Sequence, residues 1–277
     1  MSYCDEGNTN DVVIVNREIV FRFLKEEGSV ESLKGELKIL GLLENHISLR
    51  IPRPLYQEHD LVVYHLIPGK PLRRDILLRL GQGEQQLIAD QLATFHRELH
   101  GVGVDNGLRS GLPNSDAFHT QDDWLRVYGR IQERVFPYLP PHAREWARSL
   151  FDSLLDCPGH FEYEPALIYG SLSEFHIVFD EERNRVNGII DFGTAGLGDP
   201  AIDIAVLIYL YGETFCARLG KAYPEARSYL KRARHYAETF ELLWALNGIE
   251  TGDPRWFLSH IGTARGIRSF TPEEAWA

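Results

Sequence analysis

The sequence predicts an α+β fold with two lobes, a small antiparallel β-sheet followed by a larger and mostly helical part. Short apolar runs of β-branched residues, interrupted by one helical pattern, occupy residues 11–64. Apolar residues at helical spacing recur in residues 85–100, 122–157 and 201–267. The chain has 277 residues, of which 44% are hydrophobic, and this is enough for one large core or for two lobes.

The N-terminal elements can be assigned from local signals. Asn16 begins a polar turn between two alternating apolar runs, which predicts a hairpin. Ser29 is a suitable N-cap for a helix, and the Ile-Pro-Arg-Pro sequence at residues 51–54 ends that helix in an extended linker. The predicted elements are a hairpin over residues 11–24, a helix over 29–43, strands over 55–57 and 61–64, and a turn over 67–72.

Helices are expected to form most of the rest of the chain. In the first of them, Leu87, Leu92, Phe95 and Leu99 are expected to face inward. The predicted helices cover residues 85–100, 122–138, 142–157, 201–212, 224–246, which is expected to be broken, and 254–267. We therefore expect an N-lobe over residues 1–66 and a C-lobe over residues 67–277.

The most informative stretch lies between the helical regions, at residues 167–205. Short strands are predicted over residues 166–169, 176–179 and 186–190, because each is apolar and bounded by turn residues. The first strand ends at Gly170, and the third delivers the Asp191-Phe192-Gly193 tripeptide. This order places a loop after Gly170 beside the carboxylate of Asp191, as in a kinase catalytic loop beside its metal-binding Asp-Phe-Gly.

This stretch resembles the aminoglycoside phosphotransferases and related small-molecule kinases, which have a protein-kinase-like fold. The family pattern His-Gly-Asp-Leu, three residues, then Asn or His is similar to residues 169–176, Tyr-Gly-Ser-Leu-Ser-Glu-Phe-His. The family's Ile-Asp-Phe-Gly and Gly-Asp-Pro-Ala-x-Asp-Leu-Ala match residues 190–193 and 198–205. The resemblance spans nearly the whole chain. It implies transfer of a phosphoryl group from ATP, or GTP, to a small-molecule hydroxyl with Mg²⁺ as cofactor.

The resemblance also implies roles for the motif residues. Asp191 would bind Mg²⁺. His176 would be the second ligand, although imidazole is softer than the oxygen ligands that Mg²⁺ prefers. Asp199 and Asp203 would hold the backbone of the loop rather than contact the substrate.

The N-lobe would supply the nucleotide contacts. Arg22 stands where the family has the lysine for the α- and β-phosphates, with Glu36 as its partner; the alternative is an ordinary strand arginine paired to a nearby acid. The adenine would bond to the backbone around His65 and Ile67. The cover over the phosphates would come from residues 5–10, and we expect no strand before Asn10.

Two departures from the family pattern bear on activity. Ser171 stands at the position of the catalytic aspartate, and the loss of a positioned base typically costs ~10²–10⁴ in rate. Glu174 could replace that base or be a solvated loop residue. Tyr169 replaces a histidine, so we expect the loop to lose a brace. Two interpretations stay open: a phosphotransferase with impaired activity, and an inactive pseudokinase that binds nucleotide or ligand.

A serine hydrolase is disfavoured, because the residues around Ser171 do not form the Gly-x-Ser-x-Gly frame of a nucleophile elbow. The net charge of −11 argues against nucleic acid as the partner and fits a cationic acceptor. Three widely spaced cysteines, no signal-peptide pattern and no long apolar segment lead us to expect a cytoplasmic protein without a membrane partner. The sequence indicates no oligomeric state.

Overall fold

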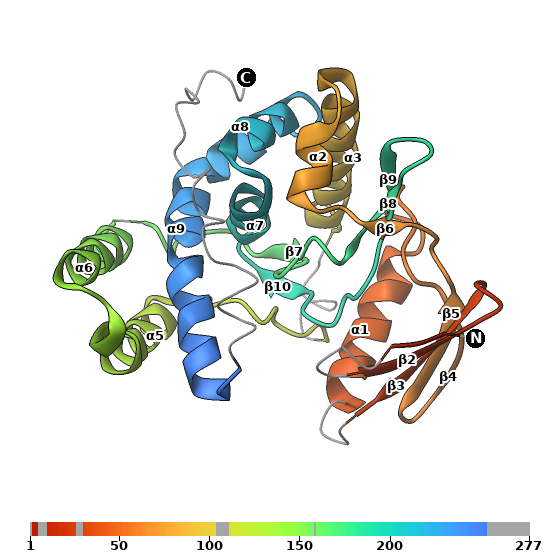
Figure 1. The fold of residues 1–277 in the computed structure, drawn as a ribbon, viewed down its shortest axis with the longest axis horizontal. Coiled ribbons are helices and arrows are strands. Elements are labelled where there is room, and N and C mark those ends of the chain that lie inside the picture. Colours follow the sequence, from red (N-terminus) through yellow and green to blue (C-terminus); the bar gives the residue numbers. More distant parts are fainter. Residues whose placement is uncertain (1, 5–9, 26–29, 104–110, 158, 254–277) are drawn as a thin grey trace.

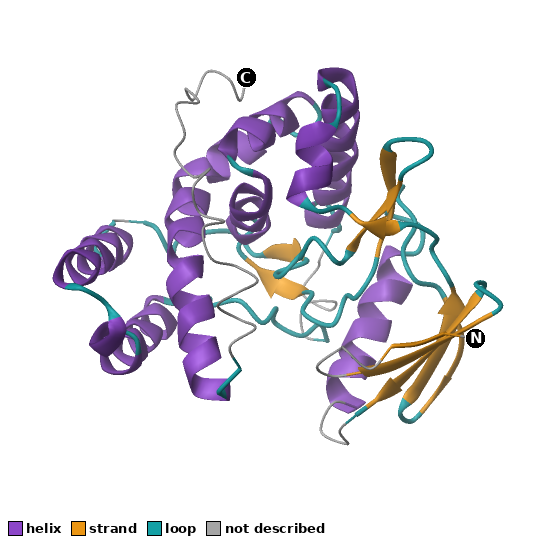
Figure 2. Cartoon of the chain, in the orientation of Figure 1, coloured by secondary structure: helices purple, strands orange, loops and turns teal. Residues whose placement is uncertain are grey.

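The computed structural model describes residues 2–4, 10–25, 30–103, 111–157 and 159–253 (Figure 1). An antiparallel sheet with the strand order β1-β2-β3-β5-β4 lies at one end of the molecule, and α1 packs beside it (Figures 1 and 2). These elements are β1 (Ser2–Cys4), β2 (Asn10–Val15), β3 (Ile19–Leu24), α1 (Val30–Leu43), β4 (Pro54–Glu58) and β5 (Leu61–His65). The predicted N-terminal sheet and helix are therefore confirmed.

The predicted hairpin forms with the expected turn. Asn16 and Arg17 have φ values of 54° and 58°, the left-handed pair that a tight hairpin with right-handed twist requires. The expectation of no strand before Asn10 was wrong, because β1 pairs antiparallel with β2, with Tyr3 opposite Val13. β1 has only three residues, Ser-Tyr-Cys, which is too short a run to show an alternating strand pattern in the sequence.

Two small sheets connect this part to the helices. β6 (Lys70–Pro71), β8 (Ile177–Asp180) and β9 (Arg185–Ile189) form one, and β7 (Ala166–Ile168) pairs with β10 (Gly196–Gly198) in the other. The three strands predicted around the central run are confirmed, whereas β6 and β10 were missed because Pro and Gly dominate them. Gly196 is required for packing, since a Cβ there would lie 2.4 Å from the backbone nitrogen of Ser115.

Helices form most of the remaining described residues, with α5 and α6 at the end of the molecule opposite to the sheet (Figure 1). They are α2 (Arg74–Arg79), α3 (Gln82–His100), α5 (Gln121–Arg134), α6 (Pro141–Leu155), α7 (Ala201–Tyr211), α8 (Glu213–Cys216) and α9 (Ala226–Thr251), with 3₁₀ turns at Phe136–Tyr138 and Ala217–Lys221. The predicted break within residues 224–246 was wrong, because α9 is continuous and contains no Pro or Gly before Gly248. The helix expected over 254–267 lies outside the described residues.

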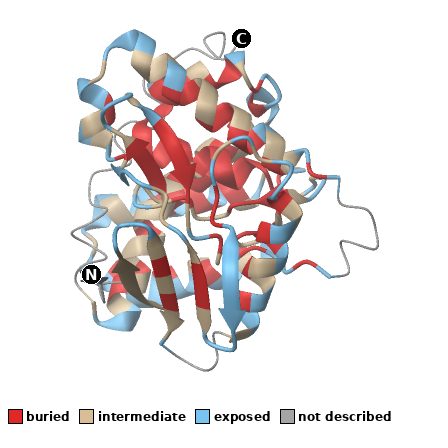
Figure 3. Cartoon of the chain, turned by 90° about the vertical axis from the view of Figure 1, so that its right-hand side faces the viewer, coloured by how far each residue is buried: buried red, intermediate tan, exposed pale blue. Residues whose placement is uncertain are grey.

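The main core lies among the helices and the two small sheets, whereas the edge strand β4 is exposed (Figure 3). Leu92, Phe95 and Leu99 of α3 are fully buried, as predicted. The prediction for Leu87 was wrong, because this side chain is 46% exposed and Ile88 occupies the buried face instead. Among the described helices, none has the length and apolar composition needed to cross a bilayer.

Candidate active site

Asp191 and His176 converge where the central strands end. Asp191 follows β9 with φ at 65°, a left-handed backbone that is uncommon for a residue other than glycine and that recurs at functional sites. His176 immediately precedes β8, and its Nε2 lies 3.4 Å from Asp191 Oδ2. The two side chains predicted to hold the metal are thus neighbours.

This pair has the chemistry of a divalent cation site. Burial lowers the pKa of His176, although the nearby Asp191 carboxylate and the Ser171 backbone act in the opposite direction. A neutral imidazole facing a carboxylate supplies two ligand atoms for a cation. Mg²⁺ is commonly held by one or two protein ligands, with phosphate oxygens and water completing its shell. No cluster of three or more metal-binding side chains occurs in the described ranges, so a cation here would need such additional ligands.

Tyr169 braces this pair, contrary to the expectation that its loop would lose a brace. The side chain is fully buried, and its hydroxyl donates to the backbone oxygen of Ile190 at 2.6 Å and contacts that of Asp191. The same hydroxyl oxygen lies 3.0 Å from His176 Nδ1. Its ring also packs edge-on against Phe192, with centroids 5.2 Å apart. A tyrosine therefore holds the backbone of the Asp-Phe-Gly segment here.

Arg22 and Glu36 bring the N-terminal sheet and α1 to the same place. Both side chains are buried, with Nη1–Oε1 and Nη2–Oε2 distances of 3.0 and 2.5 Å. A Cβ built on Gly193 would lie 3.5 Å from Asp191 Oδ1 and 4.0 Å from Glu36 Oε2. The ion pair therefore lies beside the Asp-Phe-Gly segment.

The charge of Arg22 is strongly favoured in this position. Burial acts against the guanidinium, but the Glu36 carboxylate outweighs it and raises the pKa of Arg22. Arg22 Nε is buried without a hydrogen-bond partner in the described part of the chain. Buried donors are nearly always satisfied, so this atom suits an anionic ligand such as a phosphate.

Asp203 holds the loop that carries Ser171. Its carboxylate, fully buried at the start of α7, accepts from the backbone nitrogens of Tyr169 at 2.9 Å and Gly170 at 2.8 Å. His100, at the end of α3, places its Nε2 2.9 Å from Asp203 Oδ2. Burial by itself would raise the pKa of Asp203. The hydrogen bond from His100, together with the electrostatic effect of the nearby His96, outweighs burial and lowers this pKa. The sequence did not assign His100 this role.

Asp199, just before α7, also holds neighbouring segments together through hydrogen bonds to its carboxylate. One oxygen accepts from the Ala201 backbone nitrogen at 2.9 Å, and both oxygens accept from the Arg232 guanidinium of α9 at 2.8 and 3.0 Å. Tyr236 donates to the same carboxylate at 3.1 Å. Asp199 therefore ties the segment after β10 to the long helix, and Arg232 is the partner that sequence reasoning missed.

Ser171 and Glu174 occupy different surroundings on one loop. Ser171 is half-buried and directly follows Gly170. The carboxylate of Glu174 accepts from the backbone nitrogen of Arg74, at the first turn of α2, at 3.3 Å. Burial raises the pKa of Glu174, although the Arg74 backbone partly offsets this. The structure thus places the Glu174 carboxylate at the N-terminus of α2.

The residues expected around the adenine lie at the end of the N-terminal sheet. His65 is exposed at the last position of β5 and pairs with Ile19 across the sheet. Ile67 is half-buried, and its side chain contacts the backbone of Gly188 in β9, where a Cβ would lie 2.9 Å away. Of the expected phosphate cover, residues 5–9 lie outside the described residues.

An acidic residue that the sequence did not single out lies near the loop. The backbone N–H of Asp116 donates a hydrogen bond to the backbone oxygen of Thr194 at 3.4 Å. Thr194 and Ser115 both lie close to Gly170, since a Cβ built on Gly170 would contact them. Burial raises the pKa of Asp116. No local motif could have revealed this residue, because its position depends on the parallel pairing of residues 113–115 with Leu197 of β10.

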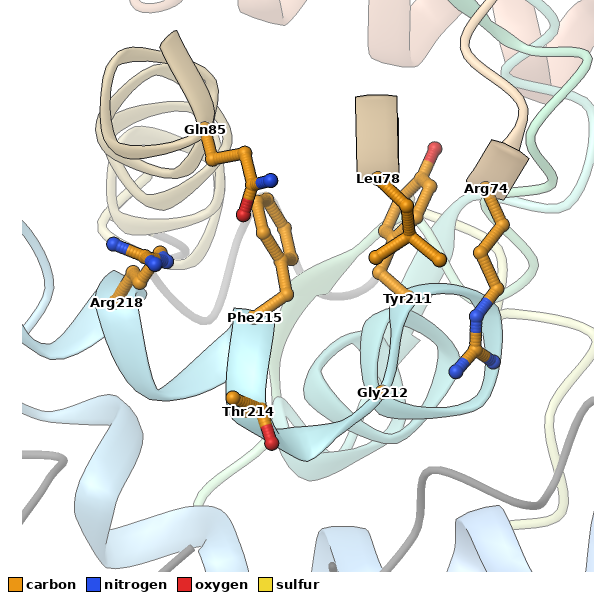
Figure 4. Close-up of a pocket in the computed structure, with 8 residues that line it drawn as sticks. All are labelled: Arg74, Leu78, Gln85, Tyr211, Gly212, Thr214, Phe215 and Arg218. Atoms are coloured by element: carbon orange, nitrogen blue, oxygen red, sulfur yellow. The ribbon is translucent and has the colours of Figure 1, made fainter. Parts of the chain in front are cut away.

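A separate cavity of about 290 Å³ lies between α2, α3 and the α7–α8 turn. In Figure 4, Arg74 and Arg218 stand on opposite sides, with Tyr211 and Phe215 between them. None of its lining residues is a predicted site residue. Arg74 connects this cavity to the candidate site, because its backbone nitrogen donates a hydrogen bond to the carboxylate of Glu174.

Comparisons with known proteins agree with this geometry. A model of the phosphotransferase enzyme family matches residues 2–239. The chain is 27% identical over 224 residues to viomycin phosphotransferase of Streptomyces vinaceus, covering 77% of this chain and 75% of that protein. It is similar to the GDP and kanamycin complex of APH(2")-IIIa, with 26% identity, a TM-score of 0.83 and coverage of 98% and 93%. A macrolide 2'-phosphotransferase of Brachybacterium faecium shares the fold, with 20% identity, a TM-score of 0.68 and coverage of 96% and 91%.

Proposed function

This chain belongs to the phosphotransferase enzyme family, and we propose that it transfers the terminal phosphoryl group of ATP or GTP to a hydroxyl of a small cationic molecule. The observation that carries the proposal is the convergence of His176 Nε2 and Asp191 Oδ2 at 3.4 Å. The buried Arg22–Glu36 pair beside them adds a cation suited to phosphate. Together they supply the charges that phosphoryl transfer requires.

Each residue would have a distinct task. Arg22 would bind phosphate oxygens of the nucleotide, while Glu36 keeps its guanidinium in place. Asp191 and His176 would hold Mg²⁺, which neutralises the charge that develops on the phosphates. Asp203 would keep the Ser171 loop in position through the backbone nitrogens of Tyr169 and Gly170.

Ser171 would orient the acceptor hydroxyl by hydrogen bonding, without removing its proton. Phosphoryl transfer has a loose transition state, in which positioning and charge neutralisation outweigh base catalysis. The acceptor oxygen would bond to phosphorus as the bond to the nucleoside diphosphate breaks, and the hydroxyl proton would leave to solvent. We therefore expect turnover to be slow rather than absent.

The acceptor class is supported by relatives and by charge. The names of two similar proteins mention viomycin and kanamycin, at 27% and 26% identity. The net charge of −11 favours a cationic molecule with hydroxyl groups over an anionic one. We propose an aminoglycoside or another basic antibiotic as the first acceptor to test.

The second candidate is a pseudokinase that binds nucleotide or ligand without transfer. The observation that favours it is Ser171 itself, because serine at the catalytic-aspartate position supplies no anionic base near neutral pH. This candidate shares the nucleotide-binding residues of the first and differs only in the expected turnover.

The test compares the wild-type chain with Ser171→Asp, Ser171→Asn and Asp191→Asn. Calorimetry measures binding of ATP and GTP with and without Mg²⁺, and a phosphate-transfer assay uses viomycin, kanamycin and related acceptors. We expect Mg²⁺-dependent nucleotide binding in the wild type, and its loss in Asp191→Asn. Ser171→Asp should raise turnover by ~10²–10⁴. Ser171→Asn introduces a side chain of the same size as aspartate but without its charge, and this variant should not raise turnover.

The outcomes separate the candidates. Slow wild-type turnover that Asp191→Asn abolishes supports the enzyme. Nucleotide binding without turnover on any acceptor supports the pseudokinase, and turnover gained only in Ser171→Asp would identify an otherwise intact site. If neither nucleotide binds, with or without Mg²⁺, both candidates are wrong.

A further inference from the structure

The hydroxyl of Tyr169 has one proton and three polar neighbours. Two are backbone carbonyl oxygens, those of Ile190 and Asp191, and these can only accept a hydrogen bond. The third is His176 Nδ1, at 3.0 Å. Since the contact to the Ile190 oxygen, at 2.6 Å, is shorter than the contact to Nδ1, we assign the phenolic proton to the carbonyl side, which leaves a lone pair of the hydroxyl oxygen toward His176.

That lone pair is one of two acceptors offered to the imidazole, because the backbone of Ser171 also forms a hydrogen bond with His176. His176 Nδ1 must carry a hydrogen to bond to the Tyr169 oxygen, and a neutral imidazole has only one N–H. Its Nε2 therefore has a free lone pair, which faces Asp191 Oδ2 at 3.4 Å. Two acceptor atoms at this distance repel one another unless a cation lies between them.

We propose that Tyr169 is a positioning residue that fixes His176 as the Nδ1–H tautomer, so that Nε2 is presented as a ligand to the divalent cation of the nucleotide. This inference rests on the proposed function. The family pattern given above has His at position 169, where this chain has Tyr, and Asn or His at position 176, where this chain has His. An asparagine amide has no tautomer to fix, whereas a histidine ligand depends on the group that binds its other nitrogen.

Tyr169 would then have two separable effects. Its bonds to Ile190 and Asp191 brace the backbone whatever stands at position 176. Its contact with Nδ1 matters only when that residue is a histidine. A double-mutant cycle of Tyr169→Phe with His176→Asn distinguishes the two effects. The bracing effect of Tyr169 should persist whether or not position 176 carries the histidine, whereas the tautomer effect should be present only when it does.

The first experiment measures the tautomer directly by ¹⁵N NMR of histidine-labelled protein. His176→Asn identifies the His176 signals by their absence. We expect the wild type to show the Nδ1–H form and Tyr169→Phe, which removes only the hydroxyl from a buried ring, to shift toward Nε2–H. A wild-type ring in the Nε2–H form, or an unchanged ring in Tyr169→Phe, overturns the proposal. This readout does not depend on turnover, so it is separate from failure of the proposed function.

The second experiment measures affinity for Mn²⁺ by electron paramagnetic resonance, with and without a non-hydrolysable ATP analogue. It uses the wild type, Tyr169→Phe, His176→Asn and the double variant. Loss of a partner behind a metal-binding histidine typically weakens metal affinity by ~10–100-fold. We expect a loss of this size on Tyr169→Phe when His176 is present, and little change in the His176→Asn background. Equal losses in both backgrounds, or no loss in either, contradict the proposal.

Discussion

Arg22 of β3 and Glu36 of α1 form a two-point ion pair in which both side chains are buried. Removing one partner from a buried pair leaves a charge without compensation, which costs far more than the pair contributes as a whole. The pair also lies beside the Asp-Phe-Gly segment, so its loss should affect both the stability of the protein and its affinity for nucleotide.

We predict that Glu36→Gln lowers the free energy of unfolding by about 3–5 kcal/mol, as measured by urea denaturation. Nucleotide affinity, measured by calorimetry below the unfolding temperature, should fall as well. Glu31→Gln is the matched control, because Glu31 pairs with Lys34 on the exposed surface of the same helix. That change should cost less than about 1 kcal/mol. Equal effects of the two substitutions would show that burial of the pair is unimportant.

Asp203 accepts two backbone hydrogen bonds with two carboxylate oxygens. In Asp203→Asn only one oxygen remains, so either Tyr169 or Gly170 loses its acceptor inside the core. We predict a loss of about 1–3 kcal/mol in stability, because an unsatisfied buried donor costs this much. Thermal unfolding measures it. An unchanged unfolding temperature would mean that the loop does not depend on Asp203.

The buried His96 should make the protein sensitive to acid. Burial lowers its pKa from 6.5 to about 4, although the nearby Asp203 acts in the opposite direction. The unfolded chain takes up a proton near pH 6.5, whereas the folded chain does so only near pH 4. Between these values the unfolded state binds more protons, so the free energy of unfolding falls as the pH is lowered.

From pH 7.5 to pH 5 this single group should remove about 2 kcal/mol of stability. Urea denaturation at the two pH values measures the change, and His96→Gln should lose about 2 kcal/mol less than the parent over the same interval. If parent and variant lose stability equally, another group is responsible for the acid sensitivity.

The two faces of α3 provide a direct test of its packing. Leu92 is fully buried and Leu87 is 46% exposed. Leu92→Ala should cost about 2–5 kcal/mol, because it removes apolar contacts and leaves a cavity. Leu87→Ala should change stability by no more than about 0.5 kcal/mol. Similar costs for both substitutions would contradict the orientation of the helix.

The sequence predicted the fold well, because long periodic patterns and the Asp191-Phe192-Gly193 tripeptide are local signals. It did not predict β1, β6 or β10, each of which has only two or three residues. β1 pairs with the neighbouring β2, whereas β6 and β10 pair with strands distant in the chain. Such pairing is decided by tertiary contacts and leaves no period in the sequence.

The site was predicted only in part, for a similar reason. The Arg22–Glu36 contact and the approach of His176 to Asp191 could be anticipated from the motifs. The position of His100 behind Asp203 could not, because a histidine at a helix end has many equivalent environments. Tyr169 was misinterpreted as the loss of a brace, since only the structure shows its hydroxyl against the Ile190 and Asp191 backbone.

The attachment of the Ser171 loop has an evolutionary consequence. Asp203 accepts hydrogen bonds from the peptide nitrogens of residues 169 and 170, which every residue except proline can supply. The hydrogen bonds that hold the backbone of the loop therefore do not involve the side chain at position 171. A lineage could exchange the side chain at this position without losing the two hydrogen bonds that hold the loop, so the residue there can change while the fold persists.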